Sequence, residues 1–192
     1  MTPRTLMLAA MLAVAATPSH AVDHPDLFVM RSPDFADNGM LKALNAGTGT
    51  SVRGPWACGG RNVSPALAWS HAPAATKSYA ILAEDPDAAS GRGGPHWIQY
   101  GIPASVTSLP RGAADHFVGG AVGQRHIPYS GPCAEPGGKP HHFIFMVFAL
   151  DLAPNALPSG LDLDGFRKAV EGHNLAEASL MARYWRPPEK KK

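Results

Sequence analysis

The sequence predicts a mainly β fold, an antiparallel β-sandwich with peripheral helices near the C-terminal end. Two observations lead to this class. Short runs rich in β-branched and aromatic residues recur along the chain, whereas apolar residues at helical spacing appear only beyond Gly160. These runs do not alternate with helical segments, so a parallel sheet built from strand–helix–strand units is not expected. With 192 residues, the chain is long enough for one domain with a sizeable core.

The first third of the chain is expected to contain short strands joined by loops. Leu27–Arg31 is the first apolar run that reads as a strand. Asp37–Gly60 is rich in Gly, Asn and Thr and should consist of short strands and loops. Asn62–Pro65 has the composition of a turn, because Asn and Pro both favour turn conformations. Ala66–Ser70 then reads as another short strand.

The longest strands are expected in the middle of the chain. Ser78–Ala83 is apolar at consecutive positions, which is typical of a strand covered on both faces. Trp97–Ile102 is the next strand. Phe143–Leu150 carries aromatic and β-branched residues on both of its faces, so we expect it at the centre of a sheet.

Two helices are expected near the C-terminal end. The first is capped by Asp162 or Asp164 and ends near Val170, because Asp is a favoured N-cap residue. The second runs from Leu175 to about Tyr184, since its apolar residues recur every three positions. Pro187-Pro188 would stop it.

The first 21 residues have the pattern of a cleavable secretory signal. Arg4 precedes an apolar run, Leu6–Ala16, and small residues lie just before the expected cleavage after Ala21. The run is shorter than the roughly 20 residues that span a bilayer. A membrane anchor and a disordered leader are the alternatives. We expect residues 22–186 to form a single domain in the periplasm or outside the cell.

The formal net charge is +2 at pH 7, which argues against nucleic acid as the main partner. The one basic run, Lys190–Lys192, belongs to a short tail (residues 187–192) that should be solvated. Beyond the leader, no segment of the sequence is apolar and long enough for stable membrane insertion.

Cys58 and Cys133 are the only cysteines, and each lies in a loop rich in Gly or Pro. In an oxidising compartment the simplest expectation is one disulfide between them. Such a bridge closes a long loop and would contribute about 4 kcal/mol to stability in the chain-entropy model. Two separate thiols are the alternative.

Ionisable side chains lie at the ends of three expected strands. Asp85 follows the first of these strands, His96 begins the second and His141 begins the third. Strand ends are rigid, so the side chains would be held in place with little further loss of entropy. Together they would form a compact polar pocket suited to a small anion or a metal. Taken singly, Asp85 also fits a turn cap, and His96 also fits a histidine satisfied within the core.

The loop before His141 is shaped by glycine and proline. Gly131 has no side chain, so a ligand can approach its backbone closely. His141 and His142 are consecutive in a strand and therefore point to opposite faces. Only one of them can face the pocket, which argues against a metal held by both. Asp87 is expected to have a turn role.

Several motifs occur in a characteristic order: Asp85-Pro86-Asp87, His96-Trp97, Gly131-Pro132-Cys133 with Pro136-Gly137, His141-His142-Phe143, and Phe148-Ala149-Leu150-Asp151. Further support comes from Asn62–Pro65, Ile102–Pro110 and Glu171–Glu177. From Arg31 to Tyr184 the chain resembles the bacterial branch of the phosphatidylethanolamine-binding proteins.

The resemblance implies a β-sandwich-like fold with a small anion pocket near the surface, which binds phosphate-like groups, including phosphorylated head groups. Carried over by motif, the pocket residues are Asp85, His96, Gly131, Pro132, His141 and Phe143. The family often has Tyr at the position of Phe143, so one hydroxyl donor is missing here. The family motif Asp-Pro-Asp-Ala-Pro ends in proline, but this chain has Ala89 at that position. The missing proline is expected to make the rim of the pocket less rigid.

These observations predict a non-enzymatic binding protein for a phospholipid head group or a phosphorylated small molecule. In this interpretation His96 and His141 donate hydrogen bonds to the anion, and Asp85 orients one imidazole. Backbone N–H groups of the glycine-rich loop add further donors. Binding should be tighter below about pH 6.5, where histidine is protonated.

Regulation or inhibition of a protein partner of the protease or kinase class is implied by the resemblance alone. A metal-assisted hydrolase using Asp85, His96 and His141 is the alternative, because these residues match a three-ligand site. The sequence has no Gly-x-Ser-x-Gly nucleophile motif. No cofactor is expected.

Overall fold

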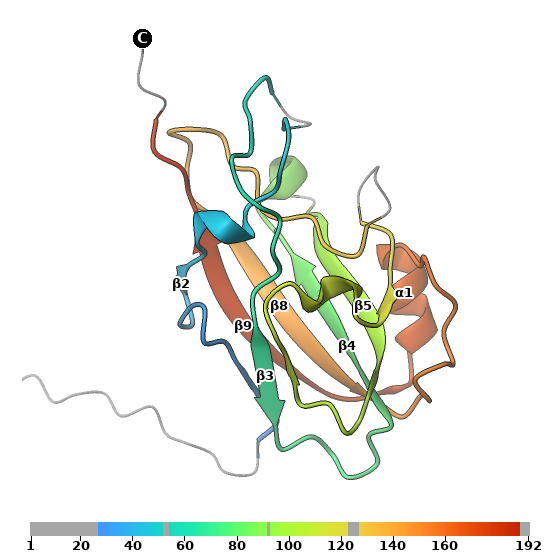
Figure 1. Cartoon of the computed structure of the whole chain (residues 1–192). Coiled ribbons are helices and arrows are strands. Elements are labelled where there is room, and N and C mark those ends of the chain that lie inside the picture. Colours follow the sequence, from blue (N-terminus) through green and yellow to red (C-terminus); the bar gives the residue numbers. More distant parts are fainter. Residues whose placement is uncertain (1–26, 52–53, 92, 123–126, 189–192) are drawn as a thin grey trace, which may run out of the picture.

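The computed structural model describes residues 27–51, 54–91, 93–122 and 127–188. Its strands form two sheets, and the smaller one lies in front of the larger one in Figure 1. The predicted mainly β class is confirmed. The predicted signal, residues 1–21, and most of the basic tail lie outside the described residues.

The larger sheet has six strands in the order β2-β9-β8-β4-β5-β7. These strands are Gly39–Met40 (β2), Ser78–Glu84 (β4), Pro95–Pro103 (β5), Val118–Gly119 (β7), His141–Leu150 (β8) and Asn174–Tyr184 (β9). Neighbouring strands are antiparallel except for β2 and β9, which are parallel. As predicted, β8 lies in the interior of the sheet, between β9 and β4.

The smaller sheet has three strands in the order β1-β3-β6. They are Val29–Arg31 (β1), Leu67–Ser70 (β3) and Ser108–Leu109 (β6), all antiparallel. Three short 3₁₀ turns lie in the loops, at Ala43–Asn45, Ala88–Gly91 and Ala113–Asp115.

The hydrophobic core covers both faces of the larger sheet. On one face Ile81 of β4 and Phe145 of β8 belong to the same cluster as Trp69 of the smaller sheet. On the other face Leu82 shares a second cluster with Phe166, which lies on the helix Leu163–Val170 (α1). Residues 78–83 of β4 are therefore all buried, which is the reason that residues 79–83 are continuously apolar.

Helix α1 was expected from the sequence, and the structure shows which residue caps it. The Asp162 carboxylate accepts a hydrogen bond from the Gly165 N–H at 2.8 Å, so Asp162 rather than Asp164 is the N-cap. Asp164 lies in the first turn, where a negative charge also favours the helix dipole. Within the described ranges, no helix has the length and apolar character needed to cross a membrane.

The second predicted helix is wrong, because residues 174–184 form strand β9. The strand pairs with β8 almost along its whole length, from Asn174 opposite Leu150 to Tyr184 opposite His141. Ala178, Leu180 and the other even-numbered residues of its second half are buried against the smaller sheet. The three-residue spacing of apolar residues suggested a helix, but the free edge of β8 supplied a hydrogen-bonding partner that local preferences do not register.

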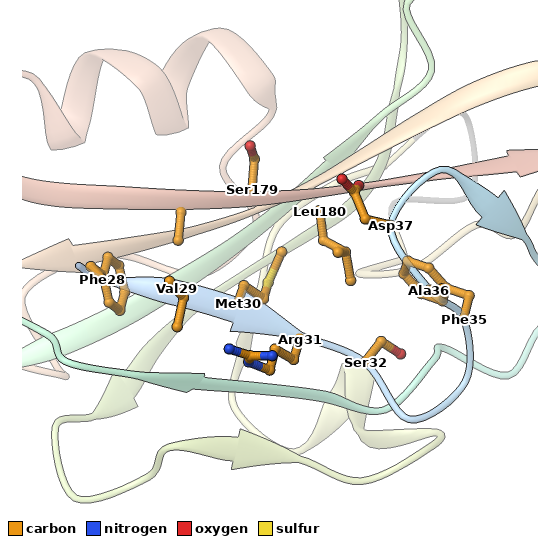
Figure 2. Close-up of a pocket in the computed structure, with 11 residues that line it drawn as sticks. Phe28, Val29, Met30, Arg31, Ser32, Phe35, Ala36, Asp37, Ser179 and Leu180 are labelled. Carbon is orange, nitrogen blue, oxygen red and sulfur yellow. The ribbon is translucent and has the colours of Figure 1, made fainter. Parts of the chain in front are cut away.

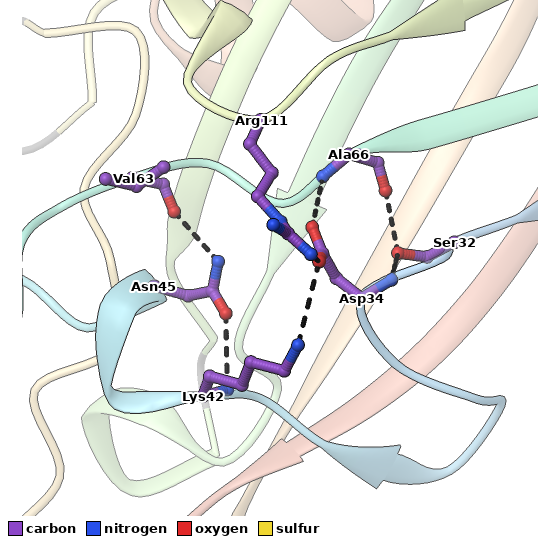
Figure 3. A network of polar contacts seen from close by, with 7 residues as sticks. All are labelled: Ser32, Asp34, Lys42, Asn45, Val63, Ala66 and Arg111. Carbon is purple, nitrogen blue, oxygen red and sulfur yellow. Dashed lines mark hydrogen bonds and ion pairs between the residues drawn. The ribbon is translucent and has the colours of Figure 1, made fainter.

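A buried carboxylate joins three loops of the sandwich (Figure 3). Asp34 is 8% exposed and accepts hydrogen bonds from the Ala66 N–H, at 2.8 Å, and from Arg111. The Lys42 ammonium lies 3.9 Å from the same carboxylate. Burial acts to raise the pKa of Asp34, but the hydrogen bonds from Arg111 and Ala66 outweigh it, and the net pKa is lowered.

Candidate functional site

Cavities open on the surface of the described residues. One, of about 490 Å³, lies between β1 and β9 (Figure 2). Its carboxylate, Asp37, already accepts the Met181 N–H at 3.0 Å. The cavity contains none of the residues that the sequence singled out, so the candidate site lies elsewhere.

The second cavity, of about 600 Å³, contains most of the predicted site residues. It lies at the edge of the larger sheet where β4 ends and where β5 and β8 begin. The strand register explains this meeting, since Glu84 at the end of β4 pairs with Pro95 on one side and Ile144 on the other. Asp85, His96, Gly131, His141 and Phe143 all line the cavity.

Asp85 and His141 form a direct pair in the cavity wall. The Asp85 Oδ2 atom lies 2.8 Å from Nδ1 of His141. Its other oxygen, Oδ1, accepts the Asp87 N–H at 2.9 Å. Asp85 is 3% exposed, so both oxygens are held by the protein. Because a carboxylate only accepts, Nδ1 of His141 carries the proton, and Nε2 is the ring's other hydrogen-bonding atom.

His96 is held in the same way by a backbone carbonyl. Its Nδ1 lies 2.5 Å from the Ser130 carbonyl oxygen, which also only accepts. The His96 ring meets Phe143 edge to face, with the ring centroids 5.0 Å apart and the planes at 82°. The contact fixes the orientation of the imidazole against an apolar surface.

Gly131 and Pro132 have packing roles in the structure. A Cβ on Gly131 would lie 2.0 Å from the Asn45 carbonyl oxygen, so glycine is needed here for close packing of two loops. The Gly131 N–H donates to Asn62 Oδ1 at 2.8 Å and is therefore not an unused donor for an anion. Pro132 is buried and is not among the lining residues; its carbonyl accepts the Gly47 N–H at 2.9 Å.

His142 points away from the cavity and has a carboxylate of its own. Asp87 Oδ2 accepts both the backbone N–H and Nδ1 of His142, each at 2.8 Å. The backbone hydrogen bond is the main reason that the pKa of Asp87 is lowered. Asp87 was expected to serve its own turn, but it ties that turn to the start of β8. The alternation of side chains along a strand explains why only His141 lines the cavity.

The predicted disulfide is present. Cys58 and Cys133 are bonded, with Cα atoms 4.7 Å apart, and both line the cavity. The bond joins the loop before β3 to the loop before β8, so two of the walls are covalently linked. Apart from this bond, Arg186 donates to the carbonyls of Ala57 and Ala134, each next to one of the cysteines.

Sequence reasoning missed the residues that line the cavity away from the two histidines. They include Thr48, Thr50, Trp56, Val122, Ile127 and Glu135. All of them come from loops, and nothing in their local pattern indicates which side chains a distant strand end will meet. In the described part of the chain, no three His, Cys, Asp or Glu side chains are grouped closely enough to hold a metal ion.

The family model of the phosphatidylethanolamine-binding proteins matches residues 31–185. The chain belongs to the phosphatidylethanolamine-binding protein family. The matched region contains every element described above from β2 to β9 and all the residues of the cavity. It also agrees with the resemblance drawn from the ordered motifs between Arg31 and Tyr184.

Relatives in Escherichia coli K12 support this membership. The chain is 37% identical to the protein YbhB over 134 residues, which cover 65% of this chain and 83% of YbhB. It is 40% identical to YbcL over 111 residues, which cover 54% of this chain and 61% of YbcL. The match to YbcL thus spans less than two thirds of that relative.

Solved structures of family members share the fold. The crystal structure of E. coli YbcL, described as a member of the mammalian PEBP family, superimposes with a TM-score of 0.72 at 30% identity. The superposition covers 82% of this chain and 98% of YbcL. The family homologue CT736 from Chlamydia trachomatis gives a TM-score of 0.70 at 26% identity, covering 86% of this chain and 99% of that one.

Proposed function

We propose that this family member is a non-enzymatic binding protein whose cavity takes a small phosphate-like anion, as a phospholipid head group or a phosphorylated small molecule. The observation that carries the proposal is the state of the two histidines. Each has Nδ1 bonded to a fixed acceptor, Asp85 for His141 and the Ser130 carbonyl for His96. For His141, Nε2 is therefore the ring atom through which a ligand would be met.

This arrangement links anion binding to proton uptake. A neutral imidazole whose Nδ1 carries the proton has only an acceptor at Nε2, so it has no hydrogen bond to donate to the oxygens of an anion. Once protonated, Nε2 becomes a charged donor, and a hydrogen bond to a charged group contributes roughly 1.5–3 kcal/mol. Asp85 holds the ring in this orientation by accepting the hydrogen bond from Nδ1.

The carboxylate at Asp85 supports binding rather than metal-assisted hydrolysis. Both of its oxygens are engaged, one by the His141 ring and the other by a backbone N–H. A metal ligand at this position would have to give up the contact that orients His141. Titration with zinc and a phosphate ester tests the alternative, a hydrolase that uses Asp85, His96 and His141.

We also propose a periplasmic or secreted location. The disulfide between Cys58 and Cys133 supports it, because such bonds persist in oxidising compartments and are rare in the cytosol.

Calorimetric titration with inorganic phosphate and with phosphoethanolamine, with and without zinc, tests the proposal. We expect saturable, zinc-independent binding at pH 6 that His141→Ala reduces at least tenfold. His173→Ala is the matched control, because His173 has the same 2.8 Å contact with an aspartate, Asp151, outside the cavity. It should leave the affinity unchanged.

Absence of binding under all conditions would overturn the anion proposal. Binding that appears only with zinc, together with turnover of a phosphate ester, would favour the metal-assisted hydrolase instead. A large fall in melting temperature in His141→Ala would indicate a core role for this histidine rather than a ligand contact.

A further inference from the structure

The cavity of about 490 Å³ between β1 and β9 (Figure 2) is separate from the candidate site, and we call it the β1–β9 groove. One wall is β1, the outer strand of the smaller sheet, and the other is the part of β9 that β2 does not cover. The side chains of Met30, Ala178 and Leu180 line the groove and belong to the core cluster between the two sheets. The groove is thus an opening at the side of the sandwich with an apolar floor.

The chain itself adds a strand to this side of β9. Strand β2 runs parallel to β9, opposite Ala182 and Arg183. Just before β2, the Asn38 N–H donates to the Met181 carbonyl at 2.7 Å. The pairing then ends, because the Met181 N–H is taken at 3.0 Å by the Asp37 carboxylate instead of by a backbone carbonyl. The lateral edge of β9 therefore accepts an extended chain as far as Met181 and is open beyond it.

Ser179 and Glu177 are the next residues whose backbone groups point to this edge. Along a strand, N–H and C=O groups point alternately to the two neighbouring strands, and those of Met181 point away from β8. The same is therefore true two and four residues earlier. Both residues are exposed, and within the described residues their N–H and C=O groups have no hydrogen-bond partner. Unpaired backbone groups in a row on a strand edge pair readily with another extended chain.

We propose that the open edge of β9 in this groove binds an extended peptide segment of a partner protein as an added strand. The segment alternates apolar and basic residues.

The alternation follows from the two faces of β9. Ala178 and Leu180 point into the sandwich, so the peptide side chains on that face meet the apolar floor of the groove and the Phe28 ring in its lining. Ser179 and Glu177 point to the other face, which is exposed. A peptide side chain on that face lies in water beside the Glu177 carboxylate, and an opposite charge across a strand pair is favourable.

The other charges of the groove agree with a basic segment. Asp37 adds a second carboxylate along β9, whereas Arg31, the basic residue of the lining, lies on the opposite wall. A second copy of β9 would bring another Glu177 to the same edge, and like charges across a strand pair are destabilising. A basic segment of a different protein therefore fits this edge better than a copy of the chain itself.

Titration with a short synthetic peptide of alternating valine and lysine, blocked at both ends, tests this inference. Nuclear magnetic resonance should show saturable shifts of the Ser179 and Glu177 amide signals, and their exchange with solvent should slow at least tenfold. A valine–glutamate peptide of the same length should bind at least tenfold more weakly. The valine–lysine peptide with N-methylated backbone amides should not bind, because it keeps the side chains but has lost its donors.

Two variants test the roles of the backbone and of the charge. Ser179→Pro removes one edge N–H at a position where proline is tolerated, so it should weaken peptide binding at least tenfold with an unchanged circular dichroism spectrum. Glu177→Lys should reverse the preference in favour of the valine–glutamate peptide. Glu171→Lys is the matched control, because it makes the same charge change at an exposed position outside the groove, and it should keep the preference for lysine. If Ser179→Pro fails to fold, Glu177→Lys and the N-methylated peptide still decide the question.

The remaining outcomes would overturn the inference. Absence of shifts at Ser179 and Glu177 would refute a peptide site on this edge. Equal binding of the N-methylated peptide would refute strand addition. Dimerisation in sedimentation that Ser179→Pro abolishes would assign the edge to a second copy instead. The anion proposal is independent of these results, and phosphate affinity should be the same in Ser179→Pro and in the wild-type protein.

Discussion

The protonation state of the site is decided by single hydrogen bonds at Nδ1. A histidine without a fixed partner exchanges its proton between the two ring nitrogens and can offer a donor to an anion while still neutral. Asp85 removes this freedom for His141, and the Ser130 carbonyl removes it for His96. Donation from Nε2 then requires the positively charged ring, so the fixed acceptors would make the proposed anion binding depend on pH.

The hydrogen bonds at Nδ1 predict that protons are bound together with the anion. Sulfate is a suitable probe because, unlike phosphate, it keeps one charge state between pH 5.5 and 8. Sulfate binding should take up at least one proton, and its affinity should fall at least tenfold from pH 5.5 to pH 8, because donation from Nε2 requires the charged ring. Calorimetry in buffers of different ionisation enthalpy measures the proton uptake.

Asp85→Asn is the matching variant. It keeps the size of the side chain, but an amide can donate as well as accept, so Nδ1 of His141 no longer has to carry the proton. The fall in sulfate affinity between pH 5.5 and pH 8 should therefore become smaller. Equal sulfate affinity at pH 5.5 and pH 8 in the wild-type protein would contradict the mechanism. An equally large fall in Asp85→Asn would show that this carboxylate does not fix the proton at Nδ1.

At the scale of elements, strands from distant parts of the chain place the site residues. The turn after β4 carries Asp85 and Asp87, and each of them holds one of two consecutive histidines at the start of β8. One pair lines the cavity and the other lies on the opposite face. The β4–β8 pairing therefore determines which histidine lines the cavity.

The carboxylate of Asp34 gives a stability prediction for the loops around the smaller sheet. Asp34→Asn weakens the charge-assisted hydrogen bond from Arg111 and should lower the free energy of unfolding by about 1–3 kcal/mol at pH 7. Urea unfolding of the variant and of the wild-type protein measures the difference. Glu171→Gln, at an exposed position after α1, is the control and should change little.

The effect should depend on pH in a defined direction. The pKa of Asp34 is lower in the folded protein than its ordinary value. Its stabilising contribution is therefore present above the unfolded value near 4 and is lost as the pH falls through the folded pKa. The difference between wild type and Asp34→Asn should shrink below pH 4, and a difference that grows there would contradict this account.

At the scale of the whole molecule, the disulfide joins two loops that are 75 residues apart in the sequence. It complements the hydrogen bonds between the same loops, from Gly131 to Asn62 and from Gly47 to Pro132. The core of the sandwich does not depend on it, because both hydrophobic clusters are built mainly on the strands and α1.

Removal of the disulfide should therefore destabilise the protein without unfolding it. For a loop of this length, the chain-entropy model gives about 4 kcal/mol as the stabilisation lost. Thermal and urea unfolding of the Cys58→Ser/Cys133→Ser double variant measures the loss, and far-ultraviolet circular dichroism checks that the fold remains. An unchanged free energy of unfolding would show that the hydrogen bonds alone hold the two loops.

Much of the fold and the position of the site followed from the sequence by itself. The strands at 78–84 and 141–150 were recognisable because burial on one or both faces leaves a local apolar pattern. The start of α1 near Asp162 or Asp164 and the pairing of the two cysteines also follow from local chemistry or composition. The same is true of the ionisable residues at strand ends, because they interrupt apolar runs.

Only the tertiary structure decided the remaining features. Residues 174–184 form a strand because β8 offers them an edge, and no local preference records the presence of that edge. Gly131 is required by the Asn45 carbonyl from a distant loop, and Trp56 faces the cavity because the disulfide brings its loop there. Each of these contacts joins residues far apart in the chain, so its energy depends on the folded arrangement and leaves no periodic signal in the sequence.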